Sequence, residues 1–273
     1  MATGTVLIYT ASVTTRLKYT FDLIFRDLLG IDYKFTHSAD DFRNFKGPAF
    51  SYSDHALGDE LFFYASRLLF EKGIEDQHIS VFDWNGTKAF FATHPKYVFP
   101  FDPFAASFYL VSRYEEYLPH LRDAHDRYDT TESLAYQKSF LNKPLVNIYA
   151  NLIRDVLKSR FPELNFPEKK YRFISTIDID NAWAYLEKGF MRTAGAFARS
   201  LVQLDFEELV LRAKVLAGLE HDPYDTYELQ LQLQKQYKFK SIYFFLLGEY
   251  GVNDKNVPVD SRKFRSLIKS IAD

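Results

Sequence analysis

The stretch from Tyr171 to Asn181, YRFISTIDIDN, constrains the fold more than any other part of the chain. It begins as an apolar, β-branched run without helical spacing, which is typical of a buried strand. It ends in two carboxylates, Asp178 and Asp180, with one residue between them. Because successive side chains on a strand point to opposite faces, we expect both carboxylates on one face. In α/β folds, ligands and active sites gather where such strands end.

This acid pair has two interpretations, which the pattern alone leaves open. Two carboxylates this close repel each other unless a cation, a shared proton or a basic neighbour relieves the repulsion. In that case Asp178 and Asp180 form a functional site. In the simpler interpretation, one aspartate caps the next helix and the other is solvated.

The composition excludes several classes of protein. The 273 residues are 47% hydrophobic, which is enough core material for one or two domains. A net charge of -2 gives no electrostatic case for binding nucleic acid or an acidic membrane. Because the chain has no Cys, any metal must be bound by Asp, Glu, His or backbone oxygen. We find no signal peptide and no apolar stretch that spans a bilayer, so we expect a cytoplasmic protein.

The first 165 residues predict an α/β domain. Strands are expected at 5–9, 33–35 and 49–52, and a helix at 13–29. This order is a β-α-β pattern, and Gly30 is a natural helix stop. Residues 60–70 fit either a helix or two short strands.

Local turn and cap signals complete this first domain. Asn85-Gly86 between the apolar runs 79–82 and 88–92 predicts a β-hairpin, because both residues tolerate positive φ. Asp102 and Pro103 suit the N-cap and first turn of a helix. Helices are expected at 104–118 and 145–161, with a polar loop at 120–132 between them.

The segment 161–170 combines two prolines with a charge run and predicts a linker. We therefore expect an N-terminal α/β domain at 1–165, with three layers, and a second domain at 166–273. The second domain has a further buried strand at 240–247, followed by a turn at 248–251. Helices are expected at 182–189, 197–216, 226–237 and 261–272, with Asp225 and Glu228 forming a capping box for the third. Two parallel strands lack cover and neighbours, so we expect a fragment cut within this domain.

Thr176-Ile177-Asp178-Ile179-Asp180 resembles the first motif of the polysaccharide deacetylase (NodB-homology) family, in which a strand ends in Thr, an apolar residue and two acids. The whole chain also resembles a bacterial group in which an α/β domain precedes a deacetylase-like domain. The segments that carry this broader resemblance are 101–110, 112–117, 222–227 and 241–247.

The resemblance implies a distorted (β/α) barrel, a divalent metal such as zinc, and removal of an acyl group, usually acetyl, from an amino sugar. It implies Asp178 as the general base and Asp180 as a metal ligand, with a carbohydrate as the binding partner. The chemistry suits such a pair, because the cation polarises the amide carbonyl and acidifies a bound water whose proton a carboxylate accepts.

The chain departs from the family pattern in two ways. The family's acids are usually adjacent, whereas Ile179 separates them here. The paired His ligands of the second motif have no counterpart, because none of the seven histidines forms an H-x-x-x-H pair. We therefore expect this fragment to be unable to hold the metal and to be inactive. The spacing of His221 gives no support for a substitute ligand.

Two alternatives remain open. Asp178-Ile179-Asp180 after an apolar run also resembles the motif of haloacid dehalogenase-like phosphatases, with Asp178 as nucleophile, Asp180 as acid/base and Mg²⁺ between them. That family expects Thr or Val where this chain has Ala182. The other alternative is a non-catalytic carbohydrate-binding or scaffolding protein whose aromatic side chains stack on sugars. Core packing accounts for the same aromatic content.

Overall fold

The computed structural model describes residues 4–248 and 257–272. The chain divides into two compact units, Met1–Lys169 and Lys170–Asp273. Residues 161–174, all of them described, contain no helix or strand. The division falls within this connecting segment, as does the boundary expected after residue 165. We call the two parts unit 1 and unit 2.

Unit 1 is a mixed α/β unit built on a four-stranded parallel sheet in the order β2-β1-β3-β4. The strands are β1 (Val6–Tyr9), β2 (Tyr33–Thr36), β3 (Ala49–Ser53) and β4 (Leu61–Tyr64). The helices are α1 (Thr15–Phe21), η1 (Asp22–Leu29), α2 (Ala39–Asn44), η2 (Arg67–Phe70), α3 (Pro103–Val111), η3 (Tyr114–Tyr117), η4 (Thr130–Glu132), α4 (Leu134–Gln137) and α5 (Leu145–Arg160). The ambiguous segment 60–70 therefore contains one strand and one short helix.

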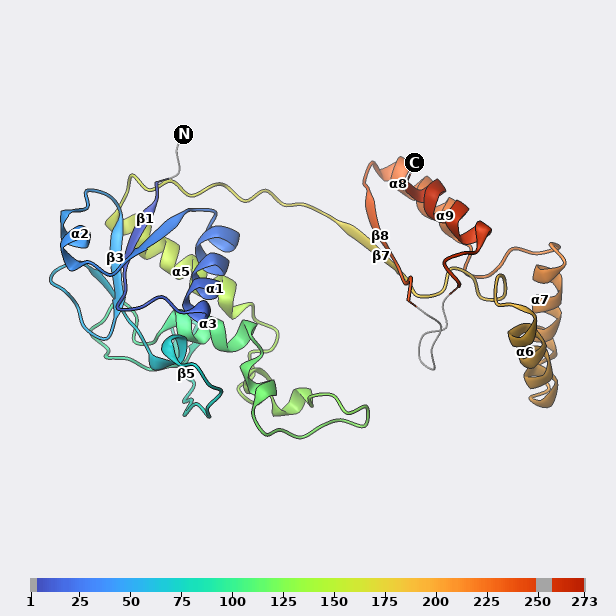
Figure 1. The fold of residues 1–273 in the computed structure, drawn as a ribbon, viewed down its shortest axis with the longest axis horizontal. Helices are drawn as coiled ribbons and strands as arrows, with labels where there is room; N and C mark the ends of the chain where they lie inside the picture. Colours follow the sequence, from blue (N-terminus) through green and yellow to red (C-terminus); the bar gives the residue numbers. More distant parts are fainter. Residues whose placement is uncertain (1–3, 249–256, 273) are drawn as a thin grey trace. The chain divides into compact units, whose positions relative to one another are not determined.

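Helices lie on both faces of this sheet, with α2 on one side and α1, α3 and α5 on the other (Figure 1). Phe42 of α2 packs against Tyr9 of β1, with ring centroids 5.9 Å apart. On the opposite face, Phe21 stacks on Phe104 of α3 at 4.5 Å and tilts against Tyr52 at 5.4 Å. The aromatic residues of unit 1 thus fill a core around these rings.

The Asp102 carboxylate is fully buried at the start of α3 and confirms the predicted N-cap. It accepts hydrogen bonds from Phe104 N at 2.9 Å and Ala105 N at 3.0 Å. It also accepts from Tyr52 Oη at 2.8 Å and Ser66 N at 2.7 Å, which joins α3 to β3 and to the segment after β4. Burial raises the pKa of Asp102, although these donors favour the charged form.

Two helices of unit 1 differ from the sequence-based expectation. The helix expected at 13–29 begins at Thr15 and continues from Asp22 as a π-helix, which ends at Gly30 with φ 70°. The helix expected at 104–118 ends at Val111, because Arg113 adopts a left-handed φ of 52° and a separate 3₁₀ turn follows. The predicted hairpin is confirmed, with β5 (Phe82–Trp84) and β6 (Thr87–Ala89) pairing antiparallel across Asn85 and Gly86.

Unit 2 contains two parallel strands, β7 (Ser175–Ile179) and β8 (Ser241–Phe245). Its helices are α6 (Phe190–Val202), α7 (Phe206–Leu216), α8 (Tyr227–Tyr237) and α9 (Arg262–Ala272). Most of the turn expected at 248–251 lies outside the described residues. No helix in the described part of the chain is both long and apolar enough to cross a membrane.

In unit 2, two helix predictions and one capping prediction differ from the structure. Residues 182–189 form an irregular loop, in which the Asp222 side chain accepts hydrogen bonds from the backbone N–H groups of Ala184, Tyr185 and Leu186. The helix expected at 197–216 is broken after Val202, and Asp205 caps α7 by accepting from Glu208 N at 3.0 Å. The capping box at Asp225 does not form, since among the described residues no side chain caps α8.

Candidate functional site

The acid pair lies at the carboxyl end of β7. Ile177 is partly buried and Ile179 is only 6% exposed, whereas Asp178 and Asp180 are both exposed. This alternation places Asp178 on the side of the strand opposite the isoleucines, and Asp180 directly follows the last residue of the strand. On a strand, residues two apart are separated by about 7 Å, so both side chains can reach one small ligand.

Helices cover the face of this small sheet that carries the isoleucines. Ile179 belongs to a buried cluster with Trp183, Tyr227 and Phe264, and Phe245 of β8 packs against that cluster. Tyr227 comes from α8 and Phe264 from α9, which lie together beside the strands in Figure 1.

The opposite face of the two strands is left uncovered among the described residues. In the parallel register, Asp178 lies beside Phe244, which is 54% exposed, and Thr176 lies beside Ile242, which is 50% exposed. The acid pair therefore stands at the strand end next to exposed apolar side chains of the neighbouring strand.

The loop that follows the pair, residues 180–189, is fixed by Asp222, a residue that sequence reasoning missed. Asp222 is 4% exposed. Its Oδ1 accepts from Ala184 N at 2.7 Å and Tyr224 N at 3.0 Å. Its Oδ2 accepts from Tyr185 N at 2.8 Å and Leu186 N at 3.2 Å. A buried carboxylate thus gathers backbone donors from two segments that are distant in sequence.

These donors also set the charge state of Asp222. Burial by itself raises its pKa, but the backbone donors, led by Tyr185, Ala184 and Tyr224, lower the pKa below the ordinary value for aspartate. The signal in the sequence was Asp222-Pro223, since an aspartate before proline favours a turn closed by its own side chain.

Two further contacts hold the same loop. Lys188 Nζ donates to Asn181 Oδ1 at 2.8 Å, and Tyr227 Oη donates to Ala182 O at 2.8 Å. Burial lowers the pKa of Lys188, and the nearby Arg192 lowers it further, while Asp222 acts in the opposite direction. A half-buried ammonium group therefore lies beside the residue that directly follows Asp180.

The structure bears on both interpretations of the acid pair, as a helix cap with a solvated partner or as a functional site. The next helix, α6, has Gly189 as its N-cap, and no described side chain caps its first turn. Neither aspartate is thus the cap of that helix. Within residues 4–248 and 257–272, however, no three His, Cys, Asp or Glu side chains form a group that could hold a metal ion. His221 is exposed and belongs to no such group.

Comparison with known proteins finds a match only within unit 1. No curated protein and no solved structure matches the chain. One family model, described as a family of unknown function (DUF7033), matches residues 6–162, which is more than half of the chain and lies within unit 1. The chain therefore belongs to the DUF7033 family.

Proposed function

We propose that unit 2 belongs to a carbohydrate N-deacetylase-like hydrolase that cleaves the amide of an acylated amino sugar. The observation that carries this proposal is the placement of Asp178 and Asp180 at the carboxyl end of a parallel strand, with Asp178 on the face that helices leave uncovered. In (β/α) barrels the helices lie outside the strands, and catalytic groups project from the carboxyl ends of the strands. We accordingly propose that β7 and β8 are two strands of a distorted (β/α) barrel.

In this proposal Asp178 is the general base. Its carboxylate accepts a proton from a water molecule as the water oxygen bonds to the amide carbon. The carbon–nitrogen bond then breaks as the proton held by Asp178 passes to the amine nitrogen, and acetate and the free amino sugar leave. Asp180, which directly follows the strand, orients the attacking water. The exposed Phe244 beside Asp178 offers an apolar surface for the acyl methyl group.

The described residues do not by themselves fit a resident metal. A catalytic zinc ion takes three protein ligands and leaves one position open. Here Asp178 and Asp180 have no third ligating side chain grouped with them among the described residues. Asp180 as a ligand to a divalent ion, and inactivity of residues 1–273 alone, therefore stay predictions.

The test is an assay of acetate release from oligosaccharides of N-acetylglucosamine, using the complete natural protein whatever its extent. We expect Asp178→Asn and Asp180→Asn each to lower the rate by about 100-fold or more, which is the usual contribution of a general acid or base. A chelator should abolish the activity if Asp180 binds an ion. Asp225→Asn, an exposed acid in the same unit, is the matched control and should keep the wild-type rate.

Two results would contradict the proposal, and a third would remove only the predicted metal. Acetate release that survives both substitutions would place the chemistry elsewhere. Activity that ignores the chelator would remove the metal. Hydrolysis of a phosphate ester that depends on Asp178, without acetate release, would support the phosphatase instead.

A further inference from the structure

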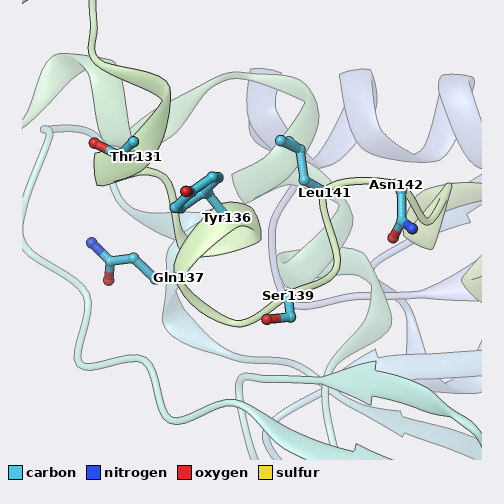
Figure 2. Close-up of a pocket in the computed structure, with 6 residues that line it drawn as sticks. All are labelled: Thr131, Tyr136, Gln137, Ser139, Leu141 and Asn142. Carbon is cyan, nitrogen blue, oxygen red and sulfur yellow. The ribbon is translucent and has the colours of Figure 1, made fainter.

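Unit 1 carries a surface groove of about 880 Å³ in the segment between α3 and α5. We call it the loop groove. Its lining consists of Thr131, Tyr136, Gln137, Ser139, Leu141 and Asn142. Figure 2 shows these side chains arranged around the short helix α4 and the turn that follows it. Neither Asp178 nor Asp180 lines the loop groove.

The base of the loop groove is anchored to the core of unit 1. Leu134 and Ala135, on the other side of α4, pack against the core. Phe140 is 2% exposed and stacks on Phe90 at 6.4 Å. Glu115 Oε2 accepts from Leu134 N at 2.7 Å, which ties the start of α4 to the 3₁₀ turn after α3. The groove is therefore held in place before any ligand binds, which reduces the entropic cost of binding.

In residues 133–141, the local backbone geometry determines which side chains enter the core and which line the loop groove. Ser133 caps α4 by accepting from Tyr136 N at 3.2 Å. The helix ends at Gln137, and Ser139, two residues later, adopts a left-handed φ of 56°. The turn directs Phe140 into the core and leaves Leu141, 61% exposed, on the surface. Tyr136 stays 54% exposed although it belongs to an anchored helix.

The chemistry of the lining points to an uncharged, hydroxyl-rich ligand. None of its six side chains carries a charge at neutral pH, which gives no attraction to an ionic partner. The Asn142 amide and the Ser139 hydroxyl can each donate and accept hydrogen bonds. The Thr131 hydroxyl donates to Asp129 Oδ1 at 2.8 Å, which leaves it as an acceptor toward a ligand. The Gln137 amide donates one N–H to Glu132 O at 3.1 Å and keeps its other N–H and its oxygen. The Tyr136 ring offers a flat apolar surface with a polar end.

We propose that the loop groove binds a neutral oligosaccharide, with one sugar ring stacked on Tyr136 and its hydroxyls bonded to the amides. Pyranose rings match this lining because one face is a set of C–H groups and the rim is a set of hydroxyls. The inference goes beyond the proposed hydrolase activity, and it rests on that proposal only for the choice of an acetylated amino sugar as the ligand to be tested first.

The experiment is calorimetric titration of the complete chain with the tetrasaccharide of N-acetylglucosamine and, separately, with cellotetraose. Asp178→Asn serves as the background, so that turnover does not disturb the measurement. We expect Tyr136→Ala to weaken binding by about tenfold or more, and Tyr136→Phe to stay within about threefold of the parent. Tyr237→Ala, which removes a tyrosine that is 66% exposed from α8, is the matched control and should bind as the parent does.

The outcomes separate this site from the acid pair. Binding that is equal at about 50 mM and about 500 mM sodium chloride supports a neutral ligand, and a steep loss with salt contradicts it. Absence of binding to both sugars, or equal binding by Tyr136→Ala and the parent, overturns the inference. If Tyr136→Ala loses binding and the wild type releases no acetate, the loop groove stands and the hydrolase proposal fails. If acetate is released but Tyr136→Ala binds the sugar as the parent does, the hydrolase proposal stands and the loop groove fails.

Discussion

At the scale of single residues, Asp222 carries the strongest prediction. Its two oxygens accept from four backbone N–H groups, three of them in the loop after the acid pair. Asp222→Asn replaces one acceptor oxygen by a donor NH₂ that faces those N–H groups. We expect the free energy of unfolding of unit 2 to fall by about 2–3 kcal/mol. Hydrogen exchange at the amides of Ala184, Tyr185 and Leu186 should accelerate with it.

Asp225→Asn is the control for this experiment, because Asp225 is exposed and lies three residues away. Its variant should leave exchange at the three loop amides unchanged. Equal exchange in Asp222→Asn and the wild type would show that the loop does not depend on this carboxylate.

The lowered pKa of Asp222 adds a pH dependence with a definite sign. The unfolded chain holds the Asp222 proton more tightly than the folded chain, so its contribution to stability is present above the unfolded pKa of about 3.9. That contribution is lost as the pH falls through the lower folded value. Wild-type unit 2 should therefore lose more stability than Asp222→Asn between about pH 6 and pH 3, measured by urea unfolding. An equal loss in both would contradict the assignment.

At the scale of elements, the hairpin of β5 and β6 permits a clean test of turn chemistry. Gly86 has φ 76°, and a Cβ added there meets nothing within 4 Å. Gly73 has the same open space without a positive φ. Only backbone conformation distinguishes them, so Gly86→Ala should destabilise unit 1 by about 1 kcal/mol. Gly73→Ala should be neutral or slightly stabilising. Thermal unfolding of the two variants tests this prediction, and an equal change in stability for Gly86→Ala and Gly73→Ala would refute it.

Elements whose signals are local could be predicted from the sequence. Asn85-Gly86 and Asp102-Pro103 each determine a turn or cap through their own backbone preferences, and the structure confirms both. The loop at 182–189 could not be predicted, because the carboxylate that accepts from its backbone N–H groups lies 38 residues from Ala184. Likewise, Thr226 starts α8 without a side-chain cap, since the preceding turn is already closed by Asp222.

The candidate site, too, could be predicted from the sequence only where its signals are local. Strand periodicity predicted Asp178 opposite Ile177 and Ile179, and the burial pattern of β7 agrees, whereas Asp180 lies one residue beyond the strand. Which face the helices leave uncovered depends on where α8 and α9 pack, and that packing involves residues more than 40 positions away. The loop groove has no sequence signal beyond a polar segment, because its lining is defined only once Phe140 is buried.

At the scale of the whole molecule, the two units have separate cores. The core of unit 1 is built from residues no later than Phe166, and that of unit 2 from residues no earlier than Ile177. Residues 167–174 between them are all exposed and include Lys169, Lys170 and Arg172. Because trypsin needs an extended, accessible chain after Lys or Arg, we expect its early cuts here. Limited digestion followed by mass spectrometry should yield a persistent fragment that ends between residues 169 and 172.

That fragment should keep its fold, since every residue of its buried core lies within it. We expect its thermal unfolding to remain cooperative, with near-ultraviolet circular dichroism like that of unit 1 in the full chain. The matched control replaces Lys169, Lys170 and Arg172 together by Gln. It should delay the appearance of the tryptic fragment without changing the unfolding transition of either unit. First cuts at the exposed Arg122 or Arg127 instead, or a fragment without cooperative unfolding, would show that the connecting segment is protected or that the core of unit 1 does not suffice.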